Sequence, residues 1–117
     1  MYSVKEIEQI VLDNRNDLID NTFCYELFEK RVFDNSLFEE LIVNINRLIE
    51  YYRLNIKSIN KDILKSILWI IESIFKVVIY HFDPFDLSKL NDFKIEEWNT
   101  SYMDQLDDIF DQTLKLI

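Results

Sequence analysis

The sequence predicts an all-α protein: an irregular bundle of five to six helices, folded as a single domain over residues 1–117. The chain has the length of one typical domain, and about half of its residues are apolar, which is enough to bury a core. Glycine is absent and Pro84 is the only proline, so the chain lacks the residues that tight β-hairpin turns prefer. Apolar residues recur instead at intervals of three and four, the period of amphipathic helices.

The N-terminal third predicts two helices. Ser3 and Glu6 have the spacing of a capping box, which indicates the start of the first helix. Asn21 or Thr22 is expected to cap a second, shorter helix that extends to about residue 33. The residues expected to face the core are Ile7, Ile10, Val11 and Leu18 in the first helix, and Phe23, Leu27 and Phe28 in the second.

The middle of the chain predicts the two longest helices. A second capping box, Ser36 and Glu39, indicates the start of a third helix that reaches roughly residue 55, and Asn60 is expected to cap the fourth. The fourth helix is apolar around most of its surface, which indicates a central position with neighbours on most sides. The expected core residues are Phe38, Leu41, Ile42, Ile45, Leu48, Ile49 and Tyr52 in the third helix, and Ile63, Leu64, Ile67, Leu68, Ile71, Ile74, Phe75, Val78, Ile79 and Phe82 in the fourth.

The fourth helix should end at Asp83, since the residue before Pro84 avoids the α conformation. Asp83 as a cap and Pro84 at the first helical position have the pattern of a further short turn. Residues 91–100 are interpreted as a loop with one helical turn, and Ser101 and Asp104 as the cap of the last helix. The last helix is expected to bury Leu106, Ile109, Phe110, Thr113 and Leu114.

The composition excludes several kinds of active site. Without glycine, the chain cannot form a glycine-rich phosphate-binding loop or an EF-hand calcium loop. The single cysteine, Cys24, and the single histidine, His81, are too few for a zinc cluster and lack the signature of a nucleophilic pair. We therefore expect no metal, no cofactor and no enzyme activity. Cys24 should be a buried, inert thiol, and His81 a structural histidine near a helix end, where the helix dipole favours its charged form.

Hydropathy and net charge indicate the compartment and the kind of partner. The most apolar stretch, residues 67–82, is interrupted by Glu72 and Lys76, so it does not have the pattern of a membrane span. The N-terminal residues lack the apolar core of a signal peptide, which favours a cytoplasmic protein. The net charge of −9 disfavours binding to nucleic acid or to an anionic membrane and favours a basic protein partner. The alternative is that the acidity only keeps the protein soluble.

The acidity is concentrated in the C-terminal third of the chain. Residues 83–111 contain nine acidic residues and two lysines, a local charge of −7. Helical spacing places Asp104, Asp107, Asp108 and Asp111 on one face, although like charges four residues apart destabilise a helix by roughly 0.2–0.5 kcal/mol per pair. The helix dipole should offset that repulsion at Asp104, near the N-terminus, but not at Asp111. We therefore interpret this face as a binding surface for a basic partner.

Two aromatic residues within the acidic stretch complete the predicted site. Trp98 and Tyr102 are flanked by carboxylates, a combination typical of interfaces that aromatic side chains anchor. Trp69, on the narrow polar stripe of the fourth helix, is either a further contact residue or covered by a neighbouring helix. The predicted partner-binding residues are Asp83, Asp86, Glu96, Glu97, Trp98, Tyr102, Asp104, Asp107, Asp108 and Asp111. The alternative interface is the exposed face of the third helix, with Glu39, Glu40, Asn44, Arg47, Glu50 and Tyr51.

The chain as a whole resembles the immunity proteins of bacterial toxin systems, such as contact-dependent growth inhibition and related polymorphic toxins. The resemblance lies in its overall character, a short, acidic, helical chain rich in Ile, Asn, Lys, Phe, Tyr and Asp. It implies a cytoplasmic inhibitor that binds a cognate toxin domain, often a basic nuclease, and blocks its substrate groove with carboxylates.

Three alternatives to an immunity protein remain open. The first is a phage inhibitor of a host defence nuclease, and the second is a non-catalytic helical adaptor that binds through an apolar groove. The third is a helical ribonuclease of the HEPN family, which the chain resembles through Lys76 and His81. In that family four to six residues separate an arginine from the histidine, so the lysine departs from the motif, and lysine does not replace arginine at a phosphate contact.

Overall fold

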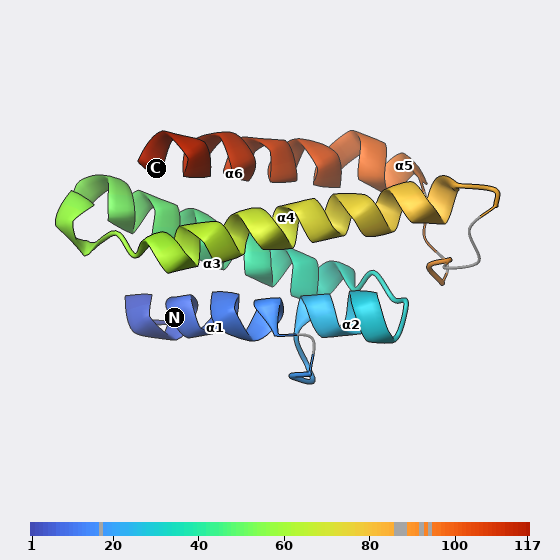
Figure 1. The fold of residues 1–117 in the computed structure, drawn as a ribbon, viewed down its shortest axis with the longest axis horizontal. Coiled ribbons are helices and arrows are strands. Elements are labelled where there is room, and N and C mark those ends of the chain that lie inside the picture. Colours follow the sequence, from blue (N-terminus) through green and yellow to red (C-terminus); the bar gives the residue numbers. More distant parts are fainter. Residues whose placement is uncertain (17, 86–88, 92, 94) are drawn as a thin grey trace.

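The computed structural model describes residues 1–16, 18–85, 89–91, 93 and 95–117. They form four helical columns that run in alternating directions (Figure 1). α1 and α2 make the first column, α3 the second and α4 the third, while α5, a π-helical turn and α6 make the fourth. The all-α prediction is confirmed. The bounds are α1 (Val4–Arg15), α2 (Phe23–Glu29), α3 (Asn35–Leu54), the 3-10 turn η1 (Ile56–Ser58), α4 (Lys61–Phe82), α5 (Ile95–Glu97), the π-turn η2 (Trp98–Tyr102) and α6 (Met103–Leu116).

One hydrophobic core runs along the inside of the bundle. α1 and α6 lie on opposite sides, and each packs against both α3 and α4. All seven core residues predicted for α3 are buried, and six of the ten predicted for α4 are buried. Ile79 and Phe82 were expected in the core but are exposed, because no described element covers that side of α4. On α6, Leu106, Ile109 and Thr113 are buried as predicted, whereas Phe110 and Leu114 are exposed.

Polar caps start the helices, largely where the sequence predicts them. The capping box at the start of α1 is present: the Ser3 hydroxyl accepts from the Glu6 amide, and the Glu6 carboxylate accepts from the Ser3 amide. Thr22 caps α2 and Asn60 caps α4. The second predicted capping box is wrong, because α3 starts two residues earlier. Its cap is Asp34, whose side chain accepts a hydrogen bond of 3.0 Å from the Leu37 amide.

Two helices end earlier than predicted. α1 ends at Arg15, so Leu18 lies beyond the helix and is exposed instead of joining the core. α2 ends at Glu29 and not near residue 33, because the chain turns sharply at Arg31, which has a left-handed φ of 59°. The turn lets the Val32 amide donate back to the carbonyl of Glu26 at 3.0 Å, and the same carbonyl accepts from the Lys30 amide at 3.2 Å.

α4 ends at Phe82 with Asp83 as its cap, as predicted from Pro84. Lys89 returns to this end: its Nζ donates to the carbonyl oxygens of His81, at 2.8 Å, and of Asp83. A lysine in this position satisfies carbonyls that have no partner within the helix and stabilises the negative end of its dipole. The Asp83 carboxylate accepts from the Phe85 amide, and residues 86–88 of the predicted short turn lie outside the described residues.

The last helical column starts earlier than predicted. Helical backbone runs without a break from Ile95 to Leu116, so Ser101 and Asp104 lie inside it and do not form its cap. Residues spaced by four drift by about 40° per step around a regular α-helix. The wider π-turn removes much of this drift, and it lets Trp98, Tyr102 and Leu106, each four residues apart, all face the core.

Candidate protein-interaction surface

The four aspartates of α6 are all exposed, as the sequence predicts. Asp111 forms an ion pair with Lys115, with 3.1 Å between Oδ2 and Nζ. Among the described residues, no cation lies within ion-pair distance of Asp104, Asp107 or Asp108. Three of the four carboxylates are therefore available to a partner. We call Asp104, Asp107, Asp108 and Asp111 the aspartate face.

The helix dipole does not stabilise the aspartate face. Because the helical column starts at Ile95, Asp104 lies about two and a half turns from its N-terminus. The dipole acts mainly within the first turn, so the predicted compensation at Asp104 is wrong. Glu96 and Glu97 occupy that first turn instead and are exposed. Asp83, at the end of α4, is also exposed, and the predicted contact residue Asp86 lies outside the described residues.

The two aromatic residues predicted as interface anchors are in the core, and that prediction is wrong. Trp98 is 5% exposed and packs edge-on against Phe75, with ring centroids 5.3 Å apart. Tyr102 is 7% exposed and stacks on Phe33 at 5.1 Å. Burial raises the pKa of the Tyr102 hydroxyl, and Glu97 and Glu39 raise it further. Neither side chain can serve as an exposed anchor in this conformation.

An apolar groove, which the sequence analysis did not predict, lies between α4 and the α5–α6 column. It consists of two hollows of about 360 and 510 Å³ that share Phe75 and Ile79 and therefore adjoin. Ile79 is 62% exposed and Phe110 is 42% exposed. The available signal was the excess of apolar residues on α4, more than its neighbours can cover. The lining residues are Ile71, Glu72, Phe75, Lys76, Val78, Ile79, Phe82, Asp83, Pro84, Ile95, Trp98, Asn99, Met103, Asp107 and Phe110.

The aspartate face and the apolar groove meet at Asp107, which belongs to both. Figure 1 shows α4 and α6 side by side along the length of this surface. This surface is an exposed apolar strip with carboxylates along its margin.

Comparison of the chain with protein-family models, with curated proteins and with solved structures finds no match.

The alternative interface on α3 is partly used inside the fold. Asn44, predicted as a contact residue, is buried. The Glu40 carboxylate accepts a hydrogen bond from the Tyr2 hydroxyl, and Arg47 donates to the Tyr2 carbonyl at 3.2 Å. The N-terminal segment therefore already engages part of this face. Trp69 on α4 is half-buried and covered by Phe28, whose ring lies edge-on at 6.0 Å.

A third concavity, of about 230 Å³, lies beside the α1–α2 connection. Its lining includes the carboxylates of Asp13, Asp20 and Glu40, and each already has a partner within the fold: Gln9 Nε2 at 2.8 Å from Asp13, Lys30 at 4.0 Å from Asp20, and the Tyr2 hydroxyl on Glu40.

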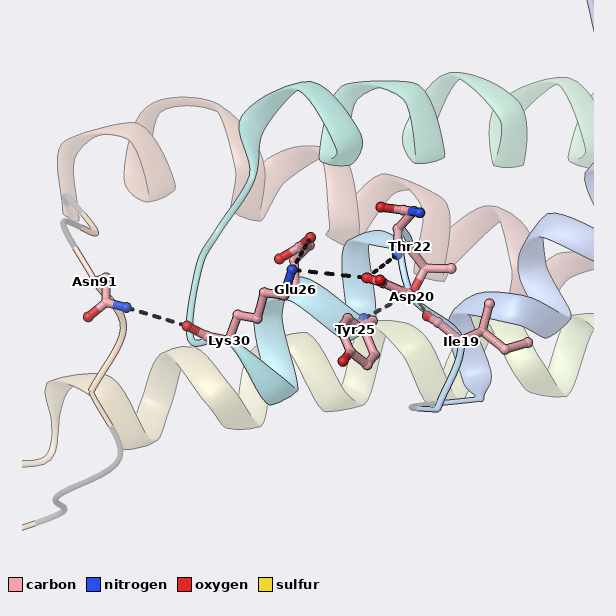
Figure 2. A network of polar contacts seen from close by, with 8 residues as sticks. Ile19, Asp20, Thr22, Tyr25, Glu26, Lys30 and Asn91 are labelled. Atoms are coloured by element: carbon pink, nitrogen blue, oxygen red, sulfur yellow. Dashed lines mark hydrogen bonds and ion pairs between the residues drawn. The ribbon is translucent and has the colours of Figure 1, made fainter.

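Hydrogen bonds hold this connection in place (Figure 2). The Thr22 hydroxyl donates to the Ile19 carbonyl and accepts from the Tyr25 amide, and Lys30 also pairs with Glu26 at 3.3 Å. Asn91, which lies between α4 and α5, donates to the Lys30 carbonyl. These contacts make the acidic groups here part of the architecture.

The side chains that could take part in catalysis are either buried or already bonded within the fold. Cys24 is fully buried, and burial raises the pKa of its thiol to about 12. His81 Nδ1 accepts a hydrogen bond of 2.9 Å from the Leu90 amide. Burial, and to a lesser degree the Lys89 cation, lower the pKa of His81, so the expected preference for the charged form is wrong. Lys76 pairs with Glu72 at 3.0 Å. Within the described residues, no three His, Cys, Asp or Glu side chains cluster as metal ligands would.

The helices differ from membrane spans in length or in hydropathy. The longest and most apolar helix is α4, with the charged residues Lys61, Asp62, Lys65, Glu72 and Lys76 along its length. None of the helices in the described ranges combines the length and the apolar character that crossing a membrane requires.

Proposed function

We propose that this protein is an immunity protein, an inhibitor that binds a cognate basic toxin domain, such as a nuclease, in the cytoplasm. The observation that carries the proposal is the aspartate face: Asp104, Asp107 and Asp108 are exposed on one helix, and no described cation pairs with them. Like charges at this spacing destabilise the helix, so a basic partner is the condition under which they become favourable.

The fold presents these carboxylates on a rigid support. Leu106, Ile109 and Thr113 anchor the opposite side of α6 in the core, so the helix holds the carboxylates in fixed positions. A nuclease groove is lined with cations that receive phosphates. Carboxylates spaced along a helix can occupy those positions and exclude the nucleic acid. The net charge of −9 also attracts a basic domain over distances near the Debye length, which speeds association.

The test begins with the partner. Protein from the source cells is captured on the tagged full chain, eluted with a salt gradient and identified by mass spectrometry. The proposal expects a basic toxin domain that moderate salt releases, encoded by a gene directly upstream. Recovery of no basic protein, or of one whose binding ignores salt, would overturn it.

A charge-matched pair of variants then locates the interface. Asp107→Lys, Asp108→Lys and Asp111→Lys together should weaken binding to the recovered toxin by at least about tenfold, mainly through slower association. Glu39→Lys, Glu40→Lys and Glu50→Lys on α3 change the net charge by the same amount. Equal losses in the two triple variants would show that only total charge matters and that the aspartate face is not the interface.

The apolar groove favours a second candidate, a non-catalytic helical adaptor. Exposed Ile79 and Phe110 are suited to apolar contacts that salt does not weaken. An adaptor of this kind would retain its partner at high salt and would bind normally with the triple lysine substitution on α6. These two readouts separate the candidates in the same capture experiment.

A further inference from the structure

The apolar groove is a part of the surface that no described element covers. Four large apolar side chains that line it are exposed, and Phe85, which follows the lining residue Pro84 in the sequence, is 92% exposed. Isolated exposed apolar residues are ordinary, but a contiguous apolar strip with polar margins marks an interaction site. The exposed apolar side chains that line it are Ile79, Phe82, Ile95 and Phe110.

The groove is long enough to hold a short helix. Its floor follows α4 from Ile71 to Phe82, a distance of about 16 Å at 1.5 Å per residue. That length matches about three turns of a helix lying along it. The half-buried ring of Phe75 packs edge-on against the buried ring of Trp98, and both rings line the groove.

The charges at the margins define what the occupant must carry. Asp107 lines one end of the groove and Asp83 the other, and both are exposed. The other two charged residues that line it, Glu72 and Lys76, form an ion pair at 3.0 Å and neutralise each other. The groove therefore presents an exposed carboxylate at each end. Lys89 Nζ bonds the backbone carbonyl of Asp83 and partly offsets the charge there, whereas no described cation pairs with Asp107. This arrangement complements an occupant with lysine or arginine near each end, most strongly at Asp107.

We propose that the groove binds an amphipathic helix of the basic partner, with its apolar residues against Ile79 and Phe110 and its cations beside Asp83 and Asp107. The basic partner rests on the proposed function, whereas the shape and charge of the groove do not. A second copy of the chain fits poorly, since it would bring a net charge of −9 and another set of exposed carboxylates to the same surface. Helix-in-groove binding of this kind uses apolar residues at intervals of three and four.

The proposal assigns different kinetic roles to the two parts of the surface. Exposed carboxylates change the association rate and the salt dependence, and buried apolar contacts change the dissociation rate. Ile79→Gln with Phe110→Gln removes the apolar contacts without changing the charge. Val43→Gln with Leu54→Gln is the matched control, because both of these residues are exposed apolar residues on α3.

The first experiment measures binding of the recovered toxin to the full chain by surface plasmon resonance at several salt concentrations. The Ile79/Phe110 variant should dissociate at least about tenfold faster with an unchanged salt slope, and the Val43/Leu54 variant should match the parent. An unchanged dissociation rate in the Ile79/Phe110 variant would overturn the proposal. Circular dichroism on each variant verifies that the helices remain folded.

The second experiment needs no toxin. The probe is a synthetic helical peptide of about 12 residues with leucines on one face and a lysine near each end. Its binding is followed by fluorescence of Trp98, which lines the groove, in a Trp69→Phe background. The peptide should shift the Trp98 emission, whereas a peptide of the same composition in shuffled order should not. Loss of the shift in the Ile79/Phe110 variant supports the groove, and a shift that survives this variant overturns it.

The two experiments distinguish the two proposals. If the peptide shifts the Trp98 emission but the capture experiment recovers no basic partner, the groove proposal is supported and the immunity function is overturned. If a basic partner is recovered, but its dissociation rate is unchanged in the Ile79/Phe110 variant and the peptide does not shift the Trp98 emission, the function is supported and the groove proposal is overturned. Sedimentation that shows a dimer, broken by the Ile79/Phe110 substitutions, would assign the groove to a second copy and overturn the partner helix.

Discussion

The hydroxyl of Tyr52 on α3 donates a hydrogen bond to Oε2 of Glu8 on α1, and both side chains are buried. The other oxygen of Glu8 lies 3.6 Å from Nζ of Lys5. The hydrogen bond between Tyr52 and Glu8 joins two helical columns through a buried carboxylate. A buried carboxylate that loses its donor retains its desolvation cost, so the pair should matter for stability.

Tyr52→Phe should therefore lower the free energy of unfolding by about 1–3 kcal/mol, because it removes the donor and leaves the Glu8 carboxylate buried without it. Urea denaturation followed by circular dichroism measures the change. Tyr51→Phe is the control, since the neighbouring Tyr51 is half-buried and no described side-chain hydrogen bond involves its hydroxyl. Equal effects of the two substitutions would contradict the role assigned to the Tyr52–Glu8 contact.

Stability should fall at alkaline pH. Burial, followed by the hydrogen bond and charge of Glu8, raises the pKa of Tyr52 above its unfolded value, so the folded protein holds a proton that the unfolded chain releases. This contribution is fully present below a pH of about 10 and is lost as the pH rises above it. The unfolding free energy of the parent should decline more steeply above that pH than that of Tyr52→Phe. Parallel curves would show that Tyr52 does not titrate differently in the two states.

Cys24 should resist thiol reagents while the protein is folded. Its side chain is fully buried and the pKa of its thiol is raised to about 12, so the thiolate is scarce at neutral pH. Labelling with Ellman's reagent should be slow in buffer and fast in denaturing urea. Fast labelling without urea would mean that α2 opens readily, and Leu27→Ala, which removes a buried neighbour on α2, should accelerate the reaction.

His81 should titrate below its ordinary pKa. Burial and the nearby Lys89 lower the pKa, and the Leu90 amide donates to Nδ1 only when that nitrogen is unprotonated. Because the folded pKa lies below the unfolded value of about 6.5, stability from His81 is present above that pH and is lost as the pH falls below it. The imidazole proton resonances, which this single histidine makes simple to assign, report the midpoint. Lys89→Gln should raise the midpoint, and an unchanged midpoint would exclude the lysine as a cause.

Neutralising single carboxylates of the aspartate face should stabilise the isolated protein, and the gain in unfolding free energy should be larger at Asp108 than at Asp111. Asp108→Asn removes repulsion with Asp104 and should raise the unfolding free energy by roughly 0.2–0.5 kcal/mol. Asp111→Asn relieves repulsion with Asp107 but also loses the ion pair with Lys115, so its gain should be smaller. Denaturation at low and high salt tests both, since screening should remove the difference. A loss of stability in Asp108→Asn would show that these carboxylates support the helix.

The sequence pattern was sufficient for the parts of the fold that depend on neighbouring residues. Ser3, Thr22 and Asn60 cap helices because each side chain bonds backbone amides only two or three residues away. The inner face of α3 was predicted in full, because one apolar stripe at helical spacing leaves one way to bury it. The exposure of the aspartate face follows for the same reason, since its carboxylates lie opposite Leu106 and Ile109.

Tertiary structure alone decided which apolar residues stay uncovered. α4 is apolar around most of its surface, so its own pattern cannot say which side lacks a neighbour, and Ile79 remains exposed because no described column packs there. Trp98 and Tyr102 are amphipathic and suit either an interface or a core, and a π-turn that the composition does not indicate directs them inward. Local hydrogen bonds and periodicity determined the helices and their polar faces. The packing of four columns, a sum of contacts between distant residues, determined the groove.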